Sequence, residues 1–347
     1  VVAGPKIRSA GLRANVPIPA GSNKINGAGK FLVPGLIALA LLSGCATQLE
    51  YRSLGSLHSE LPPRVELSNT PFFAQTAHHC GPASLAMLLN ANGVHTTPEE
   101  LAEVTYLPGR AGSLAVELLA TPRQFQQLGY QVKPELKALL QEVVAGRPVL
   151  VLQNLGLSWL PRWHFAVLIG YDLERGKVLL RSGTTRRQIM NIATFERTWL
   201  RGERWAMVVL EPGATPAVAV QVNYLQAALG LEQVGDLVAA GATYQQAIQL
   251  WPRSVNAWMA WGNNRYAAKD VESAERAYQR VLELNDRFAP AYNNLAQILL
   301  ERRQFDRAEQ MVREALTIGD GHHAVYEQTL LEIQQLRAAA SNRPDNL

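Results

Sequence analysis

Cysteine is scarce in this chain of 347 residues, which contains only Cys45 and Cys80 beside seven histidines. No spacing between these cysteines and histidines is typical of a zinc site. Long apolar runs are also missing, because the run at 31–42 has 12 residues, whereas a membrane-spanning helix needs about 20. The chain has no nucleotide-binding motif either. These absences argue against a zinc enzyme and a nucleotide-driven exporter, and we expect neither a metal nor a cofactor.

Acidic residues are absent from residues 1–44, which hold five basic residues and the apolar run. A basic stretch followed by a short apolar run is typical of an export signal peptide. The whole chain has a formal charge of +4, from 33 basic and 29 acidic residues. Without residues 1–44, 28 basic residues face 29 acidic ones and the charge is near −1. The isoelectric point of 9.1 therefore reflects the leader, and we expect no nucleic-acid partner.

The apolar run closes on Leu42-Ser43-Gly44-Cys45, which resembles a bacterial lipobox. This resemblance implies that Cys45 is lipidated and that residues 1–44 are a lipoprotein signal peptide with an upstream extension. Ala46 stands where Asp would be the usual signal for retention in the inner membrane. We therefore expect a lipid anchor on the periplasmic face of the bacterial outer membrane. An ordinary cleavage site with an incidental cysteine is the alternative. Residues 45–70 are predicted to be a tether.

Cys80 stands at the start of a predicted helix that is almost wholly apolar and should therefore be buried. Backbone N–H groups and the positive end of the helix dipole stabilise a thiolate at such a position. If Cys45 carries lipid, Cys80 is the one thiol left over in an exported protein, which also indicates a reactive residue. Gln75, five residues upstream, carries an amide able to stabilise an oxyanion. An inert, buried cysteine is the alternative, and such cysteines are common.

Two blocks of sequence carry a family resemblance: Gln75 with Cys80-Gly81-Pro82-Ala83, and Trp163-His164-Phe165-Ala166-Val167-Leu168-Ile169-Gly170-Tyr171-Asp172. In this order and spacing they resemble the papain-like cysteine peptidases that remove double-glycine leaders from bacteriocins, and their stand-alone relatives, over residues 71–212. The resemblance implies Cys80 as nucleophile, His164 as general base and Gln75 as support for the oxyanion. It does not imply a double-glycine leader as substrate, because those leader peptidases are fused to an exporter and act on the cytoplasmic side.

Ser182 occupies the position where the family usually has an Asp followed by Pro, so Ser182 is the residue expected to orient His164. A hydroxyl can accept the imidazole N–H and hold its tautomer, but it stabilises imidazolium less than a carboxylate does. Asp172 is interpreted as a turn residue at the far end of the His164 strand. A satisfied core histidine is the alternative for His164 itself. We expect His78 and His79 at the rim of the cleft or on the surface.

Predicted helices precede predicted strands between residues 71 and 212. The helices are expected at 80–89, from Thr97 with Pro98 in the first position, at 121–128 and at 136–145, and the strands at 148–152, 164–170, 177–180 and 205–210. This order predicts an α+β papain-like cysteine peptidase domain, with His164 on the sheet facing Cys80 on the helix. The Gly-rich loop at 107–113 either lines the cleft or simply connects two helices.

Small residues recur every 34 positions beyond a short linker at 213–220, as in Ala228, Gly262 and Ala296. This period is that of tetratricopeptide repeats, three of which span roughly 221–319. With a capping helix at 326–336 they predict an all-α solenoid over 221–336, followed by a disordered tail at 337–347. Such arrays usually bind an extended peptide or another protein on a concave face. The candidate partner-binding residues are Asn263, Asn264, Arg265, Asn293 and Asn294.

These patterns predict an exported, lipid-anchored cysteine peptidase that cleaves a peptide bond through an acyl-enzyme, with a repeat module for a protein partner. A non-catalytic peptide-binding scaffold of the cell envelope is the alternative. Ser182 favours that alternative, whereas Gln75, Cys80 and His164 count against it. Acyl transfer or amide hydrolysis on a non-protein envelope substrate would use the same residues and is a third possibility.

Overall fold

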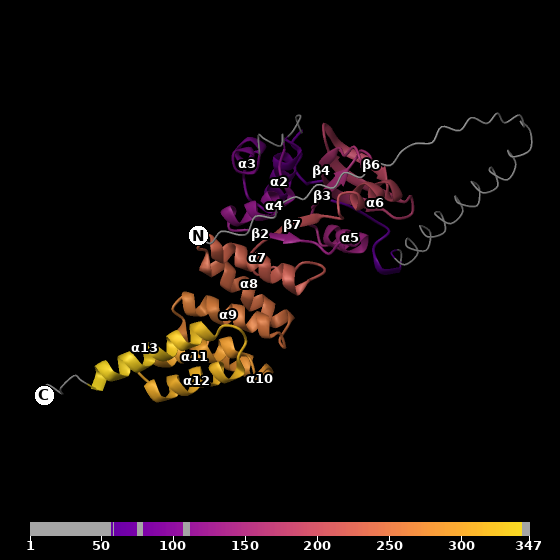
Figure 1. The fold of residues 1–347 in the computed structure, drawn as a ribbon. Coiled ribbons are helices and arrows are strands. Elements are labelled where there is room, and N and C mark those ends of the chain that lie inside the picture. The colour runs from indigo at the N-terminus through magenta and orange to yellow at the C-terminus, as the bar shows by residue number, and fades with distance from the viewer. Residues whose placement is uncertain (1–56, 58, 75–78, 107–111, 342–347) are drawn as a thin grey trace, which may run out of the picture. The chain divides into compact units, whose positions relative to one another are not determined.

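The computed structural model describes residues 57, 59–74, 79–106 and 112–341 of the chain. An antiparallel sheet of seven strands follows the order β2-β7-β3-β4-β5-β6, and β1 pairs with β4 outside this path (Figure 1). The strands are β1 (Arg64–Glu66), β2 (Leu128–Gln131), β3 (Val149–Asn154), β4 (Trp163–Asp172), β5 (Lys177–Ser182), β6 (Thr185–Asn191) and β7 (Ala206–Leu210).

Helices cover both faces of this sheet (Figure 1). Helix α2 (Cys80–Ala91) packs on one face against Leu150 and Val167. Helices α5 (Leu136–Val144) and α6 (Ile192–Leu200) belong to the core on the other face, with Val151 and Leu168. Because both faces are covered, the central strands read as continuous apolar runs rather than as alternating ones. The predicted α+β architecture is confirmed.

Helix α3 (Pro98–Thr105) begins where its capping residues predict. The hydroxyl of Thr97 accepts the backbone N–H of Glu100 at 3.2 Å, and the Glu100 carboxylate accepts the N–H of Thr97 at 3.0 Å. These two bonds satisfy N–H groups that the first turn of a helix leaves without partners. The predicted cap and the proline in the first turn are both confirmed.

The helix predicted at 121–128 is wrong in its second half. Helix α4 (Ala115–Ala120) runs into a 3-10 turn, η2 (Thr121–Phe125), and the chain then enters β2. Gln126 ends the turn with a left-handed φ of 55°. Pairing of β2 with β7 overrides the local helical pattern, and Gly129 fits there because a Cβ would lie 1.9 Å from the carbonyl oxygen of Leu119.

The segment predicted as a tether is part of the domain from Leu57 onward, as far as it is described. Leu57 and Leu61 are buried in the core, and β1 adds to the sheet beside β4. Two leucines spaced by four residues and a short strand bury too much apolar surface for a free linker. Residues 45–56 of the predicted tether lie outside the described residues, as does the predicted signal peptide.

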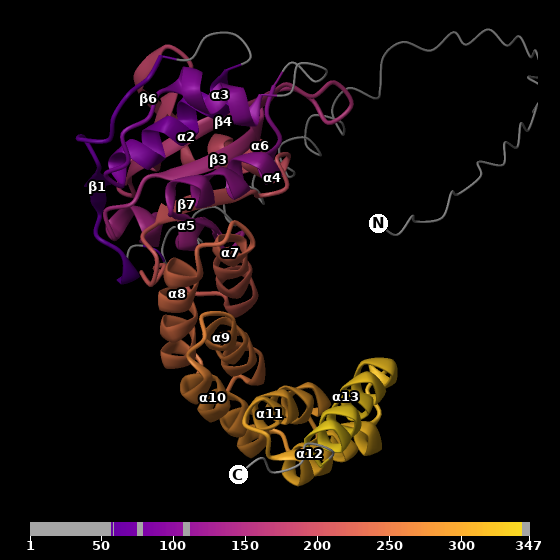
Figure 2. The same ribbon diagram turned by 90° about the vertical axis from the view of Figure 1, so that its left-hand side faces the viewer.

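Three helical hairpins and one further helix follow the sheet domain (Figure 2). Gly262 shows why small residues recur in them, because a Cβ there would lie 2.6 Å from Cε1 of Tyr278. The predicted repeats are confirmed, although the last helix continues five residues past the predicted end at 336. No described helix is both long and apolar enough to cross a bilayer. The helices are α7 (Gln221–Gln233), α8 (Leu237–Leu250), α9 (Val255–Ala267), α10 (Val271–Leu284), α11 (Ala289–Glu301), α12 (Phe305–Ile318) and α13 (His323–Ser341).

Buried polar groups hold the linker before α7. The hydroxyl of Tyr130 donates to the carbonyl oxygen of Val218 and accepts the N–H of Val220, both at 2.9 Å. The N–H of Ala217 donates to the fully buried carboxylate of Glu142 at 2.7 Å. Residues 217–220 are therefore bonded to the sheet domain rather than free to swing.

Candidate active site

Cys80 is the first residue of α2, and its side chain is partly exposed. The next nine residues of the helix are all buried, so the helix is anchored deep in the domain while its first residue reaches the surface. The first turn carries no acidic side chain that would offset the positive end of the helix dipole. His79, just before the helix, is exposed and makes an edge contact with the ring of Tyr106. These features suit a helix-start nucleophile.

Gly81 lets a second segment approach the nucleophile closely. A Cβ at this position would lie 2.9 Å from both Cβ and Oγ of Ser113. The Ser113 hydroxyl is buried, and the described residues offer it no hydrogen-bond partner. Ser113 is the described end of the Gly-rich loop, whose residues 107–111 lie outside the described part. Its contact with Gly81 favours a loop that lines the site over a plain connector.

His164 and Ser182 lie together on neighbouring strands. Nε2 of the His164 ring is 2.8 Å from Oγ of Ser182, although 18 residues separate them in the chain. β4 pairs with β5, and a register shift in the pairing of β5 with β6 between Leu180 and Ser182 marks an irregularity at this end of the strand. The hydrogen bond engages Nε2, which leaves Nδ1 as the ring nitrogen available to a thiol.

The surroundings of His164 favour its neutral form. Burial of the ring lowers the pKa of His164 below its ordinary value of 6.5, and the positive charge of Arg162 lowers it further. Both effects disfavour imidazolium. A neutral imidazole at neutral pH is a competent general base, because its free nitrogen can take a proton.

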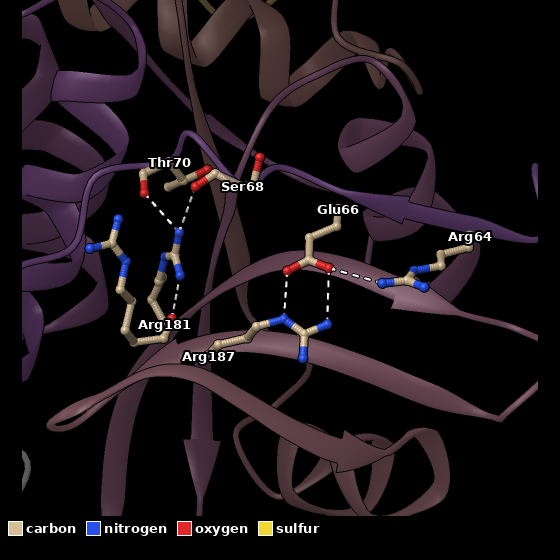
Figure 3. A network of polar contacts seen from close by, with 7 residues as sticks. Arg64, Glu66, Ser68, Thr70, Arg181 and Arg187 are labelled. Atoms are coloured by element: carbon tan, nitrogen blue, oxygen red, sulfur yellow. Dashed lines mark hydrogen bonds and ion pairs between the residues drawn. The ribbon is translucent and has the colours of Figure 1, made fainter.

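A buried cation ties the strand of Ser182 to the segment that leads toward Cys80 (Figure 3). The guanidinium of Arg181 donates to the carbonyl oxygens of Ser68 and Thr70, both at 3.0 Å, and to that of Arg186. Only 3% of Arg181 is exposed, and its Nε has no hydrogen-bond partner within the described residues. Burial lowers the pKa of the guanidinium. In the sequence, Arg181 directly follows the apolar run Val178-Leu179-Leu180 of β5.

An ion-pair cluster at the surface links β1 to β6 (Figure 3). The carboxylate of Glu66 accepts two hydrogen bonds from Arg187, at 2.6 and 2.9 Å, and one from Arg64 at 3.3 Å. The bond from Arg187 is the main reason that the pKa of Glu66 is lowered. The cluster joins β1 to β6 across the sheet edge.

The structure brings some of the predicted site residues together and leaves others apart. Cys80 packs against the same core cluster as Leu152 and Phe165, which form the strand pair next to His164. Both Cys80 and His164 are described, and no hydrogen bond joins them. Catalytic hydrogen bonds are often long before a substrate binds. Gln75, like the lipidation candidate Cys45 and His78, lies outside the described residues.

Asp172 is a turn residue, as interpreted. Its carboxylate accepts the backbone N–H of Arg175 at 2.9 Å, and it pairs with Lys177 at the end of β4 remote from His164. It therefore does not orient the base. Within the described residues no three His, Cys, Asp or Glu side chains gather in a way that could hold a metal ion.

The asparagines proposed for partner binding divide into two pairs. Asn264 is fully buried and donates to the carbonyl oxygen of Leu237 at 3.2 Å, and only 8% of Asn293 is exposed. Helix crossings cover these two amides, so the structure corrects their assignment to a binding surface. Asn294 is half-buried and donates to the exposed Asn263 at 3.0 Å. This second pair keeps a surface position.

Comparison with known families supports this division of the chain. Residues 67–207 match the model of the Peptidase_C39 like family. Residues 277–310 match the model of the tetratricopeptide repeat. No curated protein is similar enough to the chain to count as a match.

Solved structures similar to this chain each cover one part of it. A C39-like peptidase from Bacillus anthracis is 20% identical, with a TM-score of 0.38, over 43% of this chain and 98% of its own. The TPR2B domain of yeast Sti1, from a complex with pHsp70, is 13% identical over 33% of this chain and 97% of its own (TM-score 0.32). PilF of Pseudomonas aeruginosa is 22% identical over 34% and 54% (TM-score 0.32). From the two family matches, residues 67–207 are a C39-like peptidase domain that tetratricopeptide repeats follow.

Proposed function

We propose that this protein is a cysteine peptidase in which Cys80 is the nucleophile and His164 the general base. The observation that carries the proposal is the 2.8 Å contact between Nε2 of His164 and Oγ of Ser182. A core histidine needs no particular ring nitrogen to be engaged. A catalytic histidine needs one ring nitrogen held by a hydrogen bond, so that the other ring nitrogen faces the nucleophile.

The reaction begins with proton transfer from the thiol of Cys80 to Nδ1 of His164. The sulfur attacks the carbonyl carbon of the peptide, and the amide of Gln75 with a backbone N–H at the start of α2 stabilises the oxyanion. His164 returns the proton to the leaving amine as the C–N bond breaks, which leaves a thioester on Cys80. His164 then removes a proton from water, which attacks the thioester and releases the carboxyl product and the free thiol.

Ser182 holds the imidazole through a neutral hydrogen bond. Because a hydroxyl carries no charge, it fixes the ring but adds little stabilisation to the imidazolium that forms during acylation. Burial and Arg162 disfavour that imidazolium as well. The proposed enzyme therefore holds a neutral imidazole in its resting state, which can take the proton of the Cys80 thiol in the first step.

The test compares His164→Ala, Ser182→Ala and Ser182→Asp in single-turnover acylation by a small activated ester, with folding checked by circular dichroism. We expect His164→Ala to lose nearly all acylation. Ser182→Ala should lose about three- to tenfold, the value of a neutral hydrogen bond of roughly 0.5–1.5 kcal/mol. Ser182→Asp should accelerate acylation, because Arg181 is engaged with backbone carbonyls and leaves the new carboxylate to the imidazole.

His79→Ala is the matched control, since His79 is an exposed histidine directly before Cys80 and should keep wild-type acylation. If His164→Ala acylates as fast as the wild type, His164 is not the base. A protein that never acylates but binds peptides would be the non-catalytic scaffold instead.

Export and anchoring are the second part of the proposal. The lipobox-like Leu42-Ser43-Gly44-Cys45 supports lipidation at Cys45, with the domain on the periplasmic face of the outer membrane and the repeats binding a protein partner. We expect Cys45→Ser to release the protein from the membrane fraction or to leave an unprocessed precursor. Unchanged size and fractionation of this variant would contradict lipid anchoring.

A further inference from the structure

The loop between β3 and β4 exposes an unusual amount of apolar surface. We name residues 155–163, which are this loop and the first residue of β4, the Trp159 loop. Both of the chain's exposed tryptophans lie in it, whereas the other five are buried or half-buried. Exposed apolar patches of this kind mark interaction sites on folded proteins. The exposed fractions of its large apolar side chains are 43% for Leu155, 56% for Leu157, 79% for Trp159, 61% for Leu160 and 55% for Trp163.

The Trp159 loop is a built structure. Asn154 is buried beneath it, and its side-chain oxygen accepts the N–H groups of Gly156 and Arg162, both at 2.9 Å. Leu157 and Leu160 exchange two backbone hydrogen bonds of 3.1 Å across the turn. Such bonding holds the loop in one conformation, so the exposed side chains cannot be the result of fraying.

An arginine and a glycine complete the base of the loop. Arg201 donates to the carbonyl oxygen of Asn154 at 2.9 and 3.2 Å. A Cβ on Gly156 would lie 2.3 Å from the carbonyl oxygen of Leu160. A buried asparagine, a glycine and an arginine thus hold the loop in a conformation that exposes its leucine and tryptophan side chains to solvent.

The Trp159 loop ends directly at the proposed base. Trp163 pairs with Asn154, and His164 pairs with Gln153 one step further along the strands. Consecutive residues of a strand rise about 3.4 Å, so the end of the loop lies within one residue spacing of His164. Trp163 lies on the same face of β4 as Phe165, which belongs to the core cluster that Cys80 packs against. The loop therefore ends on the side of the sheet that carries the proposed nucleophile.

We propose that the Trp159 loop binds an apolar side chain, aromatic or branched aliphatic, of the substrate peptide next to the scissile bond. This inference rests on the proposed peptidase function and names its substrate class. Continuity with His164 favours a peptide over a lipid surface as the occupant, because a bilayer seated on the loop would cover the base and block access to the thiol.

Peptide binding is measured first on Cys80→Ala, which needs no turnover. Fluorescence anisotropy compares two labelled octapeptides of equal charge, one with Leu-Phe at its centre and one with Ser-Ser. Adding Trp159→Ser or Leu160→Ser should weaken binding of the Leu-Phe peptide about tenfold, the scale of a lost apolar contact. Binding of the Ser-Ser peptide should not change. Val238→Ser is the matched control, because Val238 on α8 is an equally exposed apolar residue, with 82% of its surface free.

A second measurement uses the intact thiol. Cys80 is alkylated in parallel by iodoacetamide and by a Leu-Phe chloromethyl ketone. Trp159→Ser should lower the rate with the peptidyl reagent about tenfold and leave the rate with iodoacetamide unchanged. Both proteins are also tested for sedimentation with phosphatidylethanolamine–phosphatidylglycerol vesicles.

The outcomes separate this inference from the proposed function. Equal affinities of the loop variants and the parent for the Leu-Phe peptide overturn the inference, even if the enzyme turns over. Loss of vesicle binding in Trp159→Ser with unchanged peptide affinity also overturns it and makes the loop a lipid contact. A tenfold loss of peptide affinity in a protein that never acylates supports the inference and refutes the peptidase function.

Discussion

The ring of His164 is tuned by a positive neighbour. Burial lowers the pKa of His164, and Arg162 lowers it further. An unfolded chain would protonate this histidine near pH 6.5, more readily than the folded protein does. The contribution of His164 to stability is therefore fully present above that pH and is lost as the pH falls through the lower pKa of the folded state.

Arg162→Ala tests this account at the residue scale. Removing the cation should raise the pKa of His164, because imidazolium is then less strongly disfavoured. The acid limb of the pH–rate profile for acylation by a small activated ester should move to higher pH. Arg175→Ala, at an exposed arginine in the turn after β4, should leave the limb in place. If the acid limb of the pH–rate profile lies at the same pH in Arg162→Ala as in the wild type, the electrostatic role of Arg162 is contradicted.

At the scale of elements, Arg181 joins β5 to the segment that runs from β1 toward α2. Its guanidinium bonds the carbonyl oxygens of Ser68 and Thr70, which lie more than 100 residues away in the chain. These bonds hold the segment that follows β1 against β5. A hydrogen bond from a charged donor contributes more than a neutral one, and a buried carbonyl left without a donor is costly.

Arg181→Met keeps much of the side-chain length and removes the donors. We expect the free energy of unfolding to fall by about 2 kcal/mol, since part of the lost bonding is offset by no longer burying a cation. Urea unfolding followed by circular dichroism measures it. Acylation should slow as well, because the segment before Cys80 loses its tie. Arg187→Met removes only a surface ion pair with Glu66 and should cost much less. Equal losses of unfolding free energy in Arg181→Met and Arg187→Met would contradict the proposed role of the Arg181 hydrogen bonds.

At the scale of the whole molecule, the linker between the sheet domain and the repeats is held by buried polar groups. Tyr130 is fully buried, and burial raises the pKa of its hydroxyl to about 12, so it stays neutral and keeps both hydrogen bonds at any physiological pH. The carboxylate of Glu142 accepts the N–H of Ala217 beside it. Burial raises the pKa of Glu142, although Arg147 at 2.6 Å acts in the opposite direction.

Tyr130→Phe removes the bonds to Val218 and Val220 without changing the ring. Two backbone groups then lose their partner, which costs about 1–3 kcal/mol and opens the linker more often. Limited proteolysis should cut the variant between the two parts faster than the wild type. Tyr292→Phe is the control, since its hydroxyl bonds one exposed carbonyl, that of Asp286. Equal cleavage rates for Tyr130→Phe and the wild type would show that these bonds do not hold the linker.

Local pattern alone determined the repeats, the helix start at Thr97 and Pro98, and the apolar helix that begins at Cys80. The 34-residue period marks the small residues where helices cross and can be read directly along the chain. Thr97 and Pro98 mark a helix start because capping acts between residues a few positions apart. The edge strand β6 and helix α6 were not predicted. Five of the seven residues of β6 are exposed, and the strand has no apolar run. The helix predicted at 121–128 is wrong in its second half, because the chain there enters strand β2, which pairs with β7.

Most contacts between distant groups were decided only by the tertiary structure, although the family resemblance implied that Ser182 orients His164. The register of β4 and β5 brings His164 to Ser182, and folding of the N-terminal segment carries Ser68 and Thr70 to Arg181. Helix crossings likewise bury Asn264, which the sequence pattern placed on a surface. A one-dimensional pattern reports the periodicity of each element, but contacts across 18 or 111 residues depend on strand register and on how whole elements pack.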